Sequence, residues 1–122
     1  MTTQITERST FRAQQAAQER NDFSYRSTVD VRDLPYTERV AHQATPTGVQ
    51  VTGADMGVLG AWLQAMGGTV TKVELPHGQT AWTLHTRTWS DSPRFPVVPV
   101  YVTVVQASDD PVMHEIAAAV AR

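Results

Sequence analysis

Four histidines are the side chains in this sequence best suited to act as metal ligands or general bases. Zinc sites and metalloprotease motifs place histidines and carboxylates at short spacings such as HxxxH. None of the four stands at such a spacing, and the one neighbouring carboxylate, Glu115 beside His114, would lie on a different face of a helix. We therefore predict no metal site and no cofactor. The histidines are His42, His77, His85 and His114.

A possible catalytic group without a known motif is formed by His85, Arg87 and Asp91. Asp91 stands between two serines, but a serine nucleophile is usually presented on a strained GxSxG turn, which the sequence lacks. It also lacks a phosphate-binding glycine loop. The absence of cysteine excludes thiolate nucleophiles, thiolate zinc sites and disulfides. We predict that the protein is not an enzyme, and keep a small enzyme with a site near His85 and Asp91 as an alternative.

Three tryptophans, at positions 62, 82 and 89, are the other distinctive side chains. Trp82 and Trp89 are seven residues apart on one expected strand, so their side chains should point to opposite faces of a sheet. One face would be covered by helices, and the other would be free for a partner. We therefore predict that Trp82, His85 and Trp89 contribute to a partner-binding surface.

The composition indicates one folded domain without strong attraction to polyanions. The chain has 122 residues, 41% of them apolar, and a formal net charge of −2. This size fits one core, and this charge disfavours nucleic acid as a partner. No segment reaches the roughly 18 apolar residues of a membrane span, so we expect no membrane partner and a cytoplasmic location, or the virion if the protein is phage-borne. One lysine and one asparagine against nine arginines indicate a GC-rich genome, such as that of an actinobacterium or its phage.

The segment Thr45-Pro46-Thr47-Gly48 is a turn signal that separates a polar N-terminal arm, residues 1–47, from a compact core, residues 48–122. In the arm, residues 6–20 favour a helix with Phe11 as its large apolar residue. Residues 25–31 alternate between apolar and polar, which predicts a strand, while residues 36–44 fit a helix or a strand. We expect the arm to bind a partner through Phe11, Tyr25, Val29 and Val31.

The core segment gives clearer patterns. Thr52 and Asp55 match a helix-capping box, and apolar residues then repeat at helical spacing up to Gly67-Gly68, a helix stop. Asp110-Pro111 predicts the start of a last helix. The strands are expected at residues 49–51, 69–75, 80–89 and 96–106.

The order β-α-β-β-β-α and the short connections predict an α+β fold. We expect an antiparallel sheet of three to five strands with the helices packed on one face, preceded by the arm. The predicted core residues are Leu59, Trp62, Leu63, Val100, Val102, Val104, Ile116 and Val120.

The order of one helix, three strands and one helix over residues 53–122 resembles that of the double-stranded RNA-binding domain. The resemblance covers element order and length. In that family the last helix begins with lysines that contact RNA phosphates, whereas the matching stretch here, residues 108–111, contains two aspartates. The residues that would contact RNA are therefore replaced, and the chain is not assigned to that family.

The sequence favours a non-catalytic protein–protein interaction or assembly protein, with a protein partner or a homo-oligomer as its complex. The arm has too little apolar surface to fold alone, and the valine-rich strand near the C-terminus needs cover on both faces. A nucleic-acid-binding regulatory protein is the first alternative, because aromatic residues alternate with the arginines of residues 8–39. The small enzyme is the second.

Overall fold

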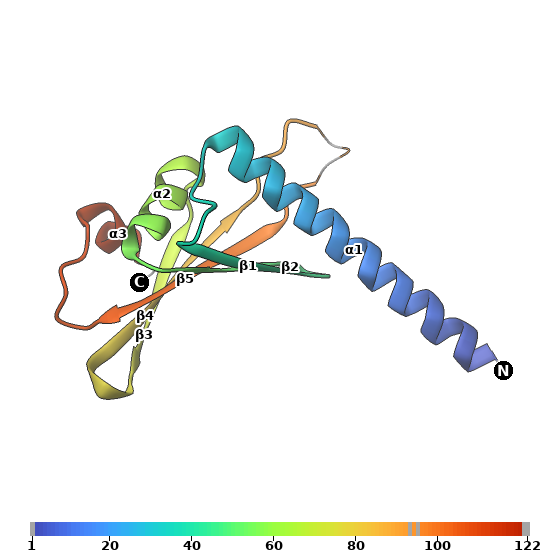
Figure 1. Cartoon of the computed structure of the whole chain (residues 1–122), viewed down its shortest axis with the longest axis horizontal. Coiled ribbons are helices and arrows are strands. Elements are labelled where there is room, and N and C mark those ends of the chain that lie inside the picture. Colours follow the sequence, from blue (N-terminus) through green and yellow to red (C-terminus); the bar gives the residue numbers. More distant parts are fainter. Residues whose placement is uncertain (1, 93, 95, 121–122) are drawn as a thin grey trace.

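The N-terminal element is one long helix, α1 (Thr2–Arg32), of 31 residues and therefore about 46 Å in length. The computed structural model describes residues 2–92, 94 and 96–120, with side chains from residue 10 onward. The C-terminal part of α1 lies on the sheet, whereas its N-terminal half extends away from the rest of the chain (Figure 1). The helix ends where Asp33 adopts a positive φ of 51° and the Leu34 N–H bonds to the Val29 carbonyl at 3.0 Å, which is a left-handed helix stop.

The predicted strand at residues 25–31 is wrong, because these residues are the last two turns of α1. Tyr25, Thr28 and Val29 are buried, and their spacing of three and one places them on one face of a helix. Val31, which the strand interpretation grouped with Tyr25 and Val29, is 54% exposed. The apolar residues of this segment are thus compatible with the two-residue period of a strand and with the 3.6-residue period of a helix. Contacts with the rest of the chain favour the helix.

Five strands form one mixed sheet in the order β1-β2-β5-β4-β3. Four of the strands were expected; β1 comes from the segment 36–44 for which helix and strand both remained open. The bounds are β1 (Val40–Thr45), β2 (Gly48–Gly53), β3 (Thr69–Leu75), β4 (Gln79–Arg87) and β5 (Pro99–Ala107).

The expectation of a wholly antiparallel sheet is wrong, since β2 pairs with β5 in parallel. The other pairs, β1–β2, β3–β4 and β4–β5, are antiparallel. Parallel neighbours need a long connection that returns the chain to the same end of the sheet. Here the helix α2 and the β3–β4 hairpin together provide it. The β3–β4 hairpin turns through a short 3₁₀ segment, η1 (Pro76–Gly78).

The helix α2 (Met56–Met66) begins later than the predicted capping box, because Asp55 is its N-cap and Thr52 belongs to β2. Its end at Gly67 is the one that the sequence predicts. The Asp55 side chain accepts the Gly57 N–H at 2.9 Å, and Gly67, with a φ of 72°, ends the helix. The last helix, α3 (His114–Ala118), begins four residues after Asp110, so the predicted N-cap at Asp110 is wrong. Beyond α3, the Val70 N–H of β3 bonds to the Ala119 carbonyl at 2.8 Å, which holds the C-terminal segment at the sheet edge.

The sheet has one covered face and one open face. Buried residues alternate along β2, β4 and β5, and the register aligns them on the covered face under α1 and α2. Apart from Gly48, which is buried, the residues between them are not buried, and they form what we call the open face. It consists of Ala41, Gln43, Thr45, Gln50, Thr52, Thr69, Thr71, Val73, Leu75, Gln79, Ala81, Thr83, His85, Arg87, Pro99, Tyr101, Thr103, Val105 and Ala107.

The core lies between the covered face and the helices. Six of the eight predicted core residues are buried. The other two, Leu63 and Val120, are partly buried at its margin. The α+β class and the packing of helices against the sheet are thus confirmed. The six are Leu59, Trp62, Val100, Val102, Val104 and Ile116.

Candidate functional site

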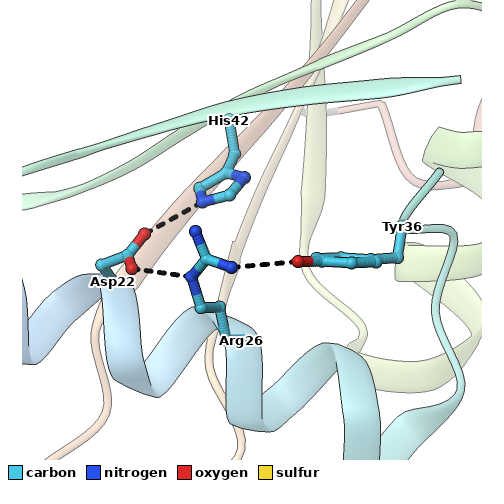
Figure 2. Close-up of polar contacts among 4 residues, drawn as sticks. All are labelled: Asp22, Arg26, Tyr36 and His42. Carbon is cyan, nitrogen blue, oxygen red and sulfur yellow. Dashed lines mark hydrogen bonds and ion pairs between the residues drawn. The ribbon is translucent and has the colours of Figure 1, made fainter. Parts of the chain in front are cut away.

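A chain of polar contacts joins α1 to β1 and to the loop between them. The Asp22 carboxylate accepts a hydrogen bond from Arg26 Nε at 2.8 Å and pairs with His42 Nε2 at 2.9 Å. The Arg26 guanidinium then donates to the Tyr36 hydroxyl at 2.9 Å. Figure 2 shows the four side chains converging from three segments of the chain. The contacts fix the direction in which α1 leaves the sheet.

Tyr25, one position before Arg26, connects this polar cluster to the core. Its ring stacks on His42 with centroids 4.3 Å apart and lies nearly parallel to Trp62 at 5.8 Å. The Tyr25 side chain is fully buried, and its hydroxyl has no hydrogen-bond partner among the described residues. Tyr25 therefore holds α1 mainly by apolar and aromatic contact.

Burial and neighbouring charges set the protonation of this cluster. Burial opposes the ionisation of Asp22, but the hydrogen bonds from Arg26 and His42 outweigh it and lower the pKa of the carboxyl below its ordinary value. Burial raises the pKa of the Tyr25 hydroxyl to about 12. The Asp22 hydrogen bond raises the pKa of the Arg26 guanidinium. Asp22 is thus a carboxylate and Tyr25 a neutral phenol throughout the physiological range.

An ionised carboxylate that holds an imidazole is also the orienting pair of many hydrolases. A catalytic pair needs a substrate space beside the free ring nitrogen. Here the Tyr25 ring covers the imidazole, which is 18% exposed. The pair is therefore better suited to fastening α1 to β1, together with the Asn21 amide, which donates to the Thr45 carbonyl at 2.8 Å.

The arm residues predicted from the sequence have two different environments. Phe11 and Val31 are 67% and 54% exposed on α1. Tyr25 and Val29 are buried against the body of the chain. Partner binding by any of them stays a prediction, and only Phe11 and Val31 are on the surface of the isolated chain.

The predicted surface around the tryptophans is not continuous. Trp82 is 7% exposed on the covered face, whereas His85 belongs to the open face and bonds to the Thr71 hydroxyl at 3.0 Å. Trp89 lies beyond the end of β4, so it does not share that strand. It lines a hollow of about 220 Å³ with Phe23 and Asp91.

Among the described residues, no hydrogen bond or ion pair joins His85, Arg87 and Asp91, the alternative catalytic group. His85 and Arg87 are exposed on β4, while Asp91 lies in the following loop, beside the hollow at Trp89. In the part of the chain that the structure describes, no three histidine, aspartate or glutamate side chains are grouped to hold a metal ion. Among the same residues, no helix has the length and apolar character needed to cross a membrane.

The sequence interpretation missed Asp22, Arg26 and Tyr36. Asp22 and Arg26 stand four residues apart, which is the spacing of an ion pair on a helix. The sequence indicates this ion pair only when residues 21–32 are assigned to a helix. The pairing of Asp22 with His42 across 20 residues had no local signal.

Comparison with known proteins gave no match. No protein-family model fits the chain, and neither the curated proteins nor the solved structures include one with significant similarity.

Proposed function

We propose that the protein is a non-catalytic assembly subunit that contacts the next copy of itself through the projecting half of α1, residues 2–16. The observation that carries the proposal is that every side chain from Thr10 to Ala16 is exposed. An isolated helix of this length is only marginally stable in water. A neighbouring subunit that covers it would supply the missing packing.

The chemistry of the projecting half fits a protein surface. Phe11 is a large apolar side chain at 67% exposure, and Arg12 follows it directly. An aromatic side chain that becomes buried on binding, with a charged residue beside it, is typical of the residues that contribute most of the binding energy in protein interfaces. The mixed charges of α1 make it less suited to nucleic acid, which binds continuous basic surfaces.

A surface that could receive this helix lies on α2. A hollow of about 660 Å³ is lined by Gly60, Leu63, Met113 and Glu115 among others. Leu63 is partly buried and Met113 is 42% exposed. We infer that Phe11 of one copy packs against the apolar side chains of this hollow, and that Arg12 pairs with Glu115 of the next copy.

Such a contact joins two different surfaces, so it is heterologous. Contacts of this kind repeat from copy to copy and produce a ring when the rotation closes, or a filament when it does not. The proposal therefore expects oligomers larger than a dimer.

Charge reversal in the full-length protein tests this contact by light scattering after size exclusion. Arg12→Glu should reduce the oligomers by placing like charges together, and combining it with Glu115→Arg should restore them. Arg20→Glu, the same reversal at an exposed site outside the projecting half, should have no effect. Equal oligomer size in all three variants and the unmodified protein would reject the contact.

A further inference from the structure

The open face of the sheet is nearly free of charge. Arg87, at the end of β4, is the one charged residue among its members, although 18% of all residues in the chain are charged. Lys72 and Glu74 of β3 alternate with open-face residues and therefore belong to the other side of the sheet. A face without carboxylates or clustered cations has nothing with which to select an acidic or a basic partner.

The centre of the open face is built from β-branched residues. A row of four threonines runs across four adjacent strands, in the order Thr52, Thr103, Thr83 and Thr71. Thr83 and Thr103 bond to each other through their hydroxyls at 3.1 Å. This bond satisfies part of their polar capacity within the chain, so the row can meet another surface with little loss of hydration.

The next row along the same strands is apolar. It consists of Val73, Ala81 and Val105, which pair in register on β3, β4 and β5. Val73 is 59% exposed and Val105 is 45% exposed. The two exposed valines, one on each side of Ala81, make this row the apolar part of the open face.

We propose that two copies of the chain pack open face to open face, as a two-fold dimer. Because the one charged member of the face, Arg87, stands at the end of β4, the symmetric contact opposes no like charges in its centre. With the two-fold axis between β4 and β5, Ala81 of one copy lies over Val105 of the other, and the threonine rows face each other. The sheets would stack about 10 Å apart with their strands nearly aligned.

The area of this contact is enough for a weak dimer. Four overlapping strands, spaced about 4.8 Å apart and about 25 Å long, cover roughly 480 Å² in each copy. The two copies together bury roughly 1,000 Å², the lower limit for a specific interface. We therefore expect a dissociation constant in the micromolar range. This dimer does not depend on the projecting half of α1.

Sedimentation equilibrium of the full-length protein tests the proposal. Val105→Lys should raise the dissociation constant of the dimer at least about tenfold, because it brings an unpaired charge into the contact. Val97→Lys is the matched control, since Val97 is 53% exposed outside the sheet, and it should leave the dimer unchanged. Arg12→Glu should also retain the dimer, which separates this contact from the one proposed for α1.

Cross-linking gives a readout that does not depend on affinity. The chain contains no cysteine, so an introduced thiol is unique. A mixture of Ala81→Cys and Val105→Cys proteins should be joined by a thiol cross-linker about 10 Å long, and a mixture of Ala81→Cys and Val97→Cys should not. A protein that stays monomeric without an 81–105 cross-link, or a dimer insensitive to Val105→Lys, would overturn the proposal and leave the open face to a different partner.

Discussion

The two halves of α1 differ in what keeps them helical. Residues 21–29 contact β1, the core and the loop after β4 through Asn21, Tyr25 and Thr28. Residues 10–16 are exposed on every side. Intrinsic helix propensity favours the exposed half, which contains Ala13, Gln14 and Gln15, whereas residues 21–29 contain mostly weak helix formers. The comparison teaches that tertiary contacts within the chain stabilise residues 21–29, whereas the described part of the chain does not cover residues 10–16.

The largest expected difference between the halves is in how much their aromatic residues contribute to the free energy of unfolding. Tyr25→Ala should lower the free energy of unfolding by about 3–5 kcal/mol, because it removes a fully buried ring between His42 and Trp62. Phe11→Ala, in the exposed half, should change it by less than about 0.5 kcal/mol. Urea unfolding followed by tryptophan fluorescence, at a concentration where the protein is monomeric, measures both.

Tyr25→Phe is the conservative control for this comparison. The Tyr25 hydroxyl has no hydrogen-bond partner among the described residues, so its removal should leave stability equal or slightly higher. A large loss of stability in Tyr25→Phe would show that the hydroxyl has an important partner. Equal losses in Tyr25→Ala and Phe11→Ala would contradict the distinction between the halves.

Substitution of Thr28, which connects α1 to the loop after β4, should have a smaller effect on the free energy of unfolding. Its buried hydroxyl accepts the Trp89 N–H at 2.9 Å and donates to the Ser24 carbonyl at 2.8 Å. Thr28→Val keeps the shape but leaves the Trp89 N–H without its acceptor, at a cost of about 1–3 kcal/mol in unfolding free energy. Thr28→Ser keeps the hydroxyl and should lose less. If serine proves as damaging as valine, the methyl group matters more than the hydrogen bond.

The smallest expected effect is the pH dependence of stability that Asp22 produces. Its pKa is lowered in the folded chain from the ordinary 3.8, so the carboxylate stabilises the fold above pH 3.8. That contribution is lost as the pH falls through the lower, folded-state pKa. Ion pairs of this exposure are worth about 0–1 kcal/mol.

The melting temperature of Asp22→Asn should therefore lie slightly below that of the unmodified protein at neutral pH. The two should converge as the pH falls below about 3.8. Asp30→Asn, at an exposed position on the same helix, is the matched control and should show no such convergence. A gap that is constant with pH would mean that the charge of Asp22 does not contribute.

The sequence predicts an element well where its apolar residues fit one period only, that of a helix or that of a strand, and a clear stop or turn signal marks its end. The helix that ends at Gly67 and the hairpin between residues 69 and 87 are examples. The segment 25–31 was predicted wrongly because Tyr25, Val29 and Val31 fit a strand, while Tyr25 and Val29 also fit a helix face. Its true partners, His42 and Trp62, lie in distant segments and have no local signal.

The same reason explains what was missed at the candidate site and in the sheet. The pair Asp22–Arg26 follows from helical spacing, but only after the helix is known. The contact with His42 and the parallel pairing of β2 with β5 depend on how separate elements dock. The α+β class, in contrast, follows from the order of elements, which local patterns define.

The parallel pairing of β2 with β5 has a consequence for how the chain reaches this fold. Val49 pairs with Val100, so forming this pair closes a loop of about 50 residues. The β1–β2 hairpin and the β3–β4–β5 meander on either side of it form from neighbouring segments. Closing long loops costs entropy before any contact compensates for it, and such pairings slow folding. The chain should therefore fold in two local pieces, and the rate at which they join along β2 and β5 should set its folding time.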